Sequence, residues 1–314
     1  MIALLQVVIP VFLVCGAGYL LTRTRYLSDP HIDGLNRYTQ GFAIPCLLFS
    51  AALNLDFGAV FDPRLLGAFY AGNTTAFLIG MLGARFLFGR RPGEAVAVGF
   101  GALFSNSVIL GVPIVERAFG GEALQATFAI VAIHAPFCYF LGITVMEFAR
   151  ADGRGLLGTG RAVINAMLHN ALMIGLLLGI GANLGGVSLP AVLADALDLV
   201  VRSALPAALV GLGGVLTRYR LRSSLGEALM VSFLSLVVHP GITFVLAHHV
   251  FDLPVPFVQG AVLTAAMAPG VNAYVFAALY NRAMGAAASS VLLATGLSVF
   301  SVSVWLSILN TTLG

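Results

Sequence analysis

Apolar runs of about 18 to 25 residues follow one another along the chain, and they constrain its fold more than any other feature. Each run is long enough to cross the bilayer core as a helix, which needs about 20 residues. Of all residues, 59% are hydrophobic and 9% are charged, whereas a soluble domain has about 25% charged residues. We therefore expect one all-α integral membrane domain over residues 1–314, with no cleaved secretory signal before the first span.

The apolar runs predict ten spans. Five lie in the first half, at 2–21, 36–54, 63–88, 94–117 and 122–148, and five in the second, at 161–183, 192–217, 226–250, 254–281 and 285–309. Arginines gather in the loops after the odd-numbered spans, at Arg23, Arg25, Arg90, Arg91, Arg150, Arg154, Arg161, Arg218, Arg220, Arg222 and Arg282. The positive-inside rule assigns these loops to the cytoplasm, so both termini are expected outside.

Five spans in each half predict an inverted repeat, because an odd number of spans turns the second copy upside down. Residues 1–150 form the first repeat and 161–314 the second, joined by a glycine-rich linker at 151–160. The second spans of the two repeats both carry an Ala-x-Pro pattern, at Pro45 and Pro206. Glycines in the first, sixth and seventh spans are expected to let these helices approach closely: Gly16, Gly18, Gly175, Gly179, Gly211, Gly213 and Gly214.

Two spans carry an interruption near the middle. The span 94–117 contains Ser105, Asn106 and Ser107 followed by Gly111 and Pro113, and the span 254–281 contains the sequence Ala-Pro-Gly-Val-Asn-Ala at 268–273. Proline removes a backbone donor and clashes with the preceding turn, and lipid offers no partner for the groups set free. Interruptions at corresponding positions in two halves point to a transporter's binding site. The alternative is that the prolines only kink their helices.

If the two interrupted spans meet, the N-termini of their second halves present partial positive charge and free N–H groups to one point. No arginine is expected near the middle of any span, so helix ends and amides would neutralise an anionic ligand, most simply a carboxylate. The candidate binding residues are Ser105, Asn106, Ser107, Pro113, His134, Tyr139, Pro269, Asn272 and Tyr274.

Two histidines, His134 and His239, lie at mid-span depth, where an ionisable residue is a functional hypothesis. A neutral histidine bonded to another helix would look the same in sequence. Asn73 is a further candidate for the cavity wall, or else an interhelical hydrogen-bond partner.

Several other functions are not expected. No aspartate or glutamate is expected at mid-span, which argues against a proton relay or a sodium site built on a carboxylate, although sodium held by backbone carbonyls stays open. Cys15, Cys46 and Cys138 lack metal-ligand or Cys-x-x-Cys spacing and are expected to be buried thiols. No catalytic motif is present, so we expect no enzyme activity, cofactor or metal site. A net charge of +3 is too small to suggest nucleic acid.

The order of these motifs resembles the auxin efflux carrier family, which includes plant auxin exporters and bacterial permeases for small organic acids. The resemblance covers nearly the whole chain and rests on Pro45, Asn106, Pro113, Phe119–Gly120, Pro206, His239–Pro240, Pro269, Asn272, Tyr280 and Asn281. It implies a scaffold of spans one, two, six and seven, and a transport unit of the other six that moves like an elevator. It also implies a homodimer formed through the scaffold.

The resemblance extends to single residues of the expected site. Asn106 matches the asparagine that faces the substrate carboxylate in the plant carriers, and His134 falls where they have a glutamine. The crossing proline of the plant carriers falls at Ala273, and their long cytoplasmic loop is absent. Auxin specificity and phosphoregulation are therefore not implied.

The sequence thus predicts a secondary transporter of small organic anions in the lipid bilayer of a bacterial inner membrane. Two alternatives stay open. One is a sodium-coupled anion symporter of the bile-acid type, and the other is a membrane receptor that binds an organic acid without moving it.

Overall fold

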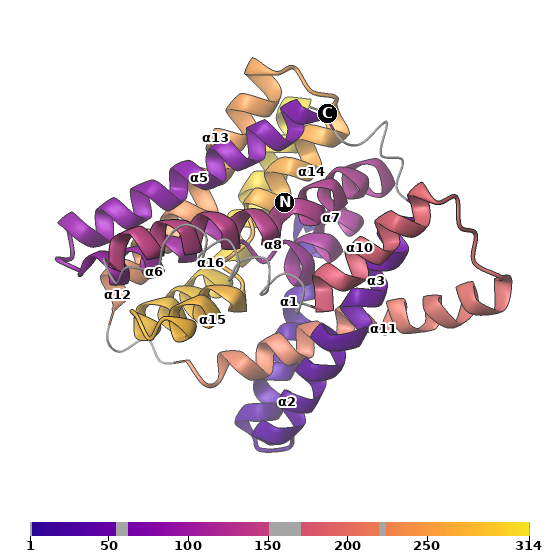
Figure 1. Ribbon diagram of the computed structural model, residues 1–314, viewed down its shortest axis with the longest axis horizontal. Helices are drawn as coiled ribbons and strands as arrows, with labels where there is room; N and C mark the ends of the chain where they lie inside the picture. Colours follow the sequence, from indigo (N-terminus) through magenta and orange to yellow (C-terminus); the bar gives the residue numbers. More distant parts are fainter. Residues whose placement is uncertain (1, 55–61, 151–170, 220–223, 314) are drawn as a thin grey trace. The chain divides into compact units, whose positions relative to one another are not determined.

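The computed structural model describes residues 2–54, 62–150, 171–219 and 224–313, and within these ranges the chain is helical and has no β-strand. The first half contains α1 (Ile2–Arg23), α2 (Asp29–Tyr38), η1 (Thr39–Ala43), α3 (Ile44–Leu53), α5 (Pro63–Phe86), α6 (Pro92–Leu103), η2 (Ser107–Gly111), α7 (Val112–Phe119) and α8 (Gly121–Arg150). The second half contains α10 (Ala171–Leu184), α11 (Ala191–Leu216), α12 (Leu225–Phe233), η3 (Leu234–Val238), α13 (His239–Phe244), η4 (Val245–Val250), α14 (Val255–Ala265), α15 (Val271–Leu279) and α16 (Met284–Leu313). Figure 1 shows these elements, and the η segments are π-helical turns.

Among the described residues, five helices are long and apolar enough to cross a membrane, at Pro63–Phe86, Gly121–Ala149, Ala191–Leu216, Leu225–Val250 and Met284–Leu313. Shorter apolar helices are Val7–Arg23, Ala171–Leu184 and Val255–Ala265. The expected all-α fold with helices able to span a membrane is therefore confirmed for the described residues. The count of ten spans and the inverted repeat stay predictions. The linker at 151–160 and the start of the sixth expected span lie outside the described residues.

The contacts divide the chain into two compact units. Unit 1 contains residues 1–10, 61–160 and 219–314, and unit 2 contains residues 11–60 and 161–218. Unit 1 thus includes both interrupted spans, and unit 2 includes α2, α3, α10, α11 and most of α1.

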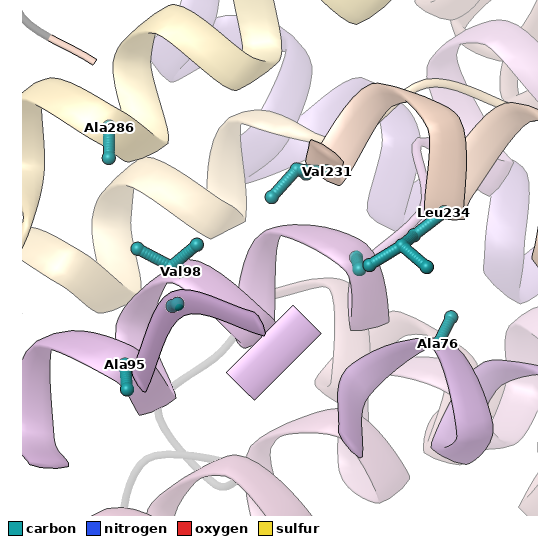
Figure 2. Packing of buried hydrophobic residues seen from close by; sticks show 8 residues of the cluster. Ala76, Ala95, Val98, Val231, Leu234 and Ala286 are labelled. Carbon is teal, nitrogen blue, oxygen red and sulfur yellow. The ribbon is translucent and has the colours of Figure 1, made fainter. Parts of the chain in front are cut away.

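Unit 1 is held together by closely spaced helices with small side chains between them. Ala76 and Ala84 of α5 pack with residues of α6, α12, η3 and α16 (Figure 2), namely Ala95, Val98, Ala102, Val231, Leu234 and Ala286. The approach of α5 to α6 needs a glycine, because a Cβ on Gly99 would lie 2.8 Å from the backbone oxygen of Phe77.

Unit 2 also depends on close helix approach. A Cβ on Gly18, Gly175 or Gly213 would collide with the backbone oxygen of Val210, Pro45 or Cys15, respectively. The expected close approach of the helices is also confirmed at Gly179, Gly211 and Gly214. The expectation is wrong at Gly16, where a Cβ would meet nothing within 4 Å.

Three of the helical prolines follow a π-helical turn, whereas Pro10, Pro136 and Pro206 lie inside the α-helices α1, α8 and α11. The turns η1, η2 and η3 each end two residues before a proline, at Pro45, Pro113 and Pro240. Such a turn widens the helix and relieves the clash of the proline ring with the preceding turn. Pro240 cannot donate to the carbonyl of Leu236 four residues earlier, and the indole N–H of Trp305 donates to that oxygen at 2.8 Å.

The expectation that no arginine lies near the middle of a span is wrong for α11. Arg202 lies in the middle of this helix and forms an ion pair of 2.7 Å with Asp198, and both side chains are exposed. The two charges neutralise each other one helical turn apart. The interrupted helices carry no arginine at the depth of their breaks.

Candidate functional site

The first interruption falls at Phe104–Asn106, between the end of α6 at Leu103 and the start of η2 at Ser107. This position corrects the expectation that Gly111 and Pro113 cause the break. Gly111 ends η2 and Pro113 lies in the first turn of α7, so both are inside helical segments. The helix tolerates Pro113 because the preceding π-helical turn makes room for its ring.

The second interruption falls at Ala266–Gly270, between α14 and α15. Pro269 lies inside this break, and Gly270 is the extended residue that precedes the first turn of α15, with φ −75° and ψ 164°. Asn272 is therefore placed in the first turn of the second half-helix. The residues from Gly260 to Gly270 are all buried.

The two interruptions pair with each other through their backbones. The N–H of Asn106 donates to the oxygen of Ala268 at 2.8 Å, and the N–H of Gly270 donates to the oxygen of Phe104 at 2.9 Å. Ser105 and Pro269 are thereby opposed in an isolated antiparallel bridge. In this geometry the two opposed residues exchange no hydrogen bonds, so the missing N–H of Pro269 costs nothing. The bridge satisfies backbone groups that lipid could not satisfy.

The end of α6 is completed by a side chain from α5. The Nδ2 of Asn73 donates to the oxygen of Leu103 at 2.6 Å, and the Sγ of Cys138 lies 3.6 Å from the same oxygen. Asn73 is fully buried. It thus caps a half-helix, which is the interhelical alternative that sequence left open.

Polar side chains of the first break gather around His134. The hydroxyls of Ser105 and Ser107 lie 2.8 Å apart, and the Oγ of Ser105 lies 3.4 Å from Nε2 of His134 on α8. Next to them, Asn106 is 6% exposed and its Nδ2 has no hydrogen-bond partner. A buried amide donor without a partner costs about 1–3 kcal/mol. A bound acceptor would remove that cost.

An aromatic wall borders this polar group. The ring of Phe104 lies 5.0 Å from that of His134 and 5.5 Å from that of Tyr139. The hydroxyl of Tyr139 donates to Oδ1 of Asn272 at 3.4 Å, which connects α8 to the start of α15. Sequence reasoning missed Phe104 because an apolar residue in an apolar span carries no signal of its own.

The electrostatics of the site come from backbone dipoles. In the part of the chain that the structure describes, the side chains of Ser105, Asn106 and His134 have no bond to an arginine or a carboxylate. The second half-helices start next to them, at Ser107 and Val271. Helix N-termini present N–H groups and partial positive charge, which favours an anion.

Three of the expected residues have other surroundings. Pro113 is buried in α7, and the ring of Tyr274 packs against Tyr219 at 5.2 Å. His239 is buried, with Nε2 3.3 Å from the oxygen of Phe69, and the ring of Phe69 contacts both His134 and His239, at 5.7 and 4.8 Å. The roles of all the expected residues in binding stay predictions.

A further polar pair joins the helices on which the site is built. The hydroxyls of Thr127 on α8 and Thr264 on α14 lie 3.0 Å apart, and both residues are fully buried. Within the described ranges, no group of three or more histidine, cysteine or acidic residues could hold a metal ion.

Comparison with known proteins identifies the family of the chain. The family described as "Membrane transport protein" matches residues 3–154 and 159–306, so the gap between the two matched blocks falls inside the expected linker. An uncharacterized transporter of Methanothermobacter thermautotrophicus is 28% identical over 315 residues, which cover 96% of each chain. The chain therefore belongs to this membrane transport protein family, the auxin efflux carrier family.

Proposed function

We propose that the chain is a secondary transporter of small organic anions, and that it holds the substrate carboxylate where the two helix interruptions pair. The observation that carries the proposal is the side chain of Asn106, whose Nδ2 is buried without a partner beside two helix N-termini. A carboxylate oxygen is the acceptor that best fits such a group, because it accepts several hydrogen bonds and its charge suits the helix dipoles.

Different groups around Asn106 would bind different parts of the substrate. One carboxylate oxygen would accept from Asn106. The hydroxyls of Ser105 and Ser107 bond to each other, and the one whose O–H is free would donate to the other oxygen. The rings of Phe104 and Tyr139 would cover the apolar part of the substrate. Bonds from neutral donors are weaker than those from a charged guanidinium. A site without arginine can therefore release its anion, as a carrier must.

The division into two units supports alternating access by an elevator-type movement. Both interruptions belong to unit 1, so the substrate would travel with it. Unit 2 would be the fixed scaffold, and its helices would form a homodimer. The protein would work in a bacterial inner membrane with both termini outside.

The proposal is tested by flux in proteoliposomes. A thermal-shift screen of mono- and dicarboxylates on the purified chain first selects a ligand, and its radiolabelled form is then used in counterflow. Asn106→Ala should reduce the initial rate at least about tenfold, since one hydrogen bond to a charged group contributes about 1.5–3 kcal/mol. Asn310→Ala is the matched control because Asn310 is exposed near the end of α16. Equal rates in the two variants would reject the site.

The same assay separates the alternatives. A strict requirement for a sodium gradient would identify a sodium-coupled symporter. Saturable binding of the ligand without flux, in protein that is correctly folded and oriented, would identify a receptor. Flux that is independent of sodium and lost in Asn106→Ala is the result that we expect.

A further inference from the structure

A second polar site lies in unit 2, away from the paired interruptions in sequence. It is a cavity of about 430 Å³ where α1 ends and the chain turns into α2. Its lining consists of Thr22, Arg23, Arg25, Leu27, Ser28, Asp29, Thr217 and Arg218. The volume falls in the range of small-ligand sites, and three of the eight lining residues are arginines.

The charges of this cavity are only partly compensated. Arg218 is held by two carboxylates, with Nε 3.2 Å from Asp29 Oδ1 and Nη1 2.7 Å from Asp33 Oδ1. Arg23 and Arg25 are exposed, and no ion pair joins either guanidinium to another described residue. Arg218 is thus fixed as part of the wall, while Arg23 and Arg25 leave positive charge available to a ligand.

The backbone conformation of Arg25 also supports a role for its side chain in this cavity. This residue has φ 64°, in the left-handed region, where the N–H of Arg25 donates to Thr22 at 3.1 Å and that of Leu27 to Leu21 at 3.0 Å. Helices commonly end with such a residue, and it is usually glycine because a side chain there costs about 1 kcal/mol. An arginine at this position keeps a guanidinium at the cavity in spite of that cost.

The surroundings of the cavity are typical of the membrane–water interface. The cavity lies at the ends of two apolar helices, α1 and α11, and the neighbouring Tyr26 is 76% exposed. Tyrosine is enriched at the membrane–water interface, and basic pockets at the ends of membrane helices bind lipid head groups. We propose that Arg23 and Arg25 bind the phosphate group of an anionic lipid. A soluble phosphate compound offers the same chemistry, so the test must distinguish the two sources.

The test uses the purified full chain in neutral detergent, titrated with phosphatidylglycerol, phosphatidylcholine or inorganic phosphate. Thermal unfolding gives the concentration of half-maximal stabilisation, and native mass spectrometry counts the bound lipids. An arginine near an anionic head group contributes about 1 kcal/mol, so each loss should weaken phosphatidylglycerol binding about fivefold. The variants are Arg25→Gly, the double variant Arg23→Gln with Arg25→Gly, and Arg37→Gln, which removes a charge of unit 2 outside the cavity.

We expect phosphatidylglycerol to stabilise the wild type and Arg37→Gln equally, and the double variant to bind it about 25-fold more weakly. Arg25→Gly should bind more weakly without unfolding at a lower temperature, because glycine suits the left-handed backbone. Competition by millimolar phosphate would assign the site to a soluble phosphate compound, and its absence would assign the site to lipid. The proposal is overturned if phosphatidylcholine stabilises as well as phosphatidylglycerol, or if Arg37→Gln weakens binding as much as Arg25→Gly.

Discussion

The two interruptions differ in what they contribute, although their backbones pair with each other. The break at Phe104–Asn106 carries the polar side chains that gather around His134, and its Asn106 has a buried donor without a partner. The break at Ala266–Gly270 contains only alanine, methionine, proline and glycine, and it takes part through its backbone. Two interruptions with similar backbone arrangements can therefore differ in the chemistry of their side chains. In the proposed site the first break would provide the ligand groups, and the second would fix their position.

The two interruptions also differ in the position of the proline relative to the break. Pro269 lies within its break, opposite Ser105, at a position where the bridge needs no donor. Pro113 follows its break and is accommodated in α7 by the turn η2. A proline in a span therefore does not by itself locate an interruption. The small polar residues locate the first break, and the sequence Ala-Pro-Gly locates the second.

The largest expected difference between the breaks is in transport. Asn106→Asp replaces a buried donor by a negative charge, so we expect the initial flux of an organic anion to fall about 100-fold, or about 2.7 kcal/mol. Asn272→Asp should cost less than about tenfold, since this half-buried side chain already serves Tyr139 as an acceptor. Asn106→Ala checks the first result without burying a charge. Equal losses in the two aspartate variants would contradict the difference between the breaks.

Two substitutions at Gly270 test whether the second break acts through its backbone. Gly270→Pro removes the N–H that donates to Phe104 while its φ of −75° remains compatible with proline. The free energy of unfolding should fall by about 1–3 kcal/mol, because the buried oxygen of Phe104 loses its donor. Gly270→Ala keeps the N–H, and its Cβ would lie 3.6 Å from Cα of Asn106 in ordinary contact. Denaturation in detergent should show a stability close to the wild type for the alanine variant only.

An unbroken helix provides the contrast to both breaks. At Pro240 the chain stays helical, and Trp305 donates to the oxygen of Leu236. Trp305→Phe removes that donor and should lower the free energy of unfolding by about 1 kcal/mol, with little effect on flux. A loss of flux as large as that of Asn106→Ala, at unchanged stability, would show that this helix also shapes the binding site.

An effect of about the same size as that of Trp305→Phe is expected outside both breaks, at the start of α5. Asp62 accepts from the N–H of Arg64 at 2.7 Å, and its pKa lies below the ordinary value because the Arg64 side chain donates to it. The contribution of ionised Asp62 to the free energy of unfolding is therefore complete above the ordinary aspartate pKa, and it is lost as the pH falls through the lowered pKa. Asp62→Ala should cost about 1 kcal/mol in thermal unfolding near neutral pH. Asp62→Asn should keep the cap and lose only this acid dependence.

Much of the fold could be predicted because lipid imposes strict rules on sequence. Apolar length predicted the long helices, and glycines predicted the close contacts of unit 2 at every position tested except Gly16. The helix of the second expected span begins before the apolar run, because the amphipathic helix α2 already begins at Asp29. Its charged residues interrupt the apolar run on which the prediction was based.

The site could be predicted less completely, because pairing depends on contacts far apart in the chain. Sequence predicted the neighbourhood of Ser105, Asn106 and His134 from polarity at mid-span. It could not show that Asn73 caps α6 or that Phe104 packs between His134 and Tyr139. These contacts follow from how the helices pack, which no local pattern encodes.

The proposed binding site depends most on the direct pairing of the two interruptions, and a double-cysteine experiment tests this pairing. Opposed residues of an antiparallel bridge without mutual hydrogen bonds have Cα atoms about 4.5 Å apart, which allows a disulfide. Ser105→Cys and Pro269→Cys are combined after the native Cys15, Cys46 and Cys138 are replaced by alanine, with a protease site placed at 151–160. After oxidation in native membranes and proteolysis, the two halves should stay linked until a reductant is added, while each single-cysteine variant separates. Separation of the halves in the oxidised double variant would contradict the pairing and the binding site built on it.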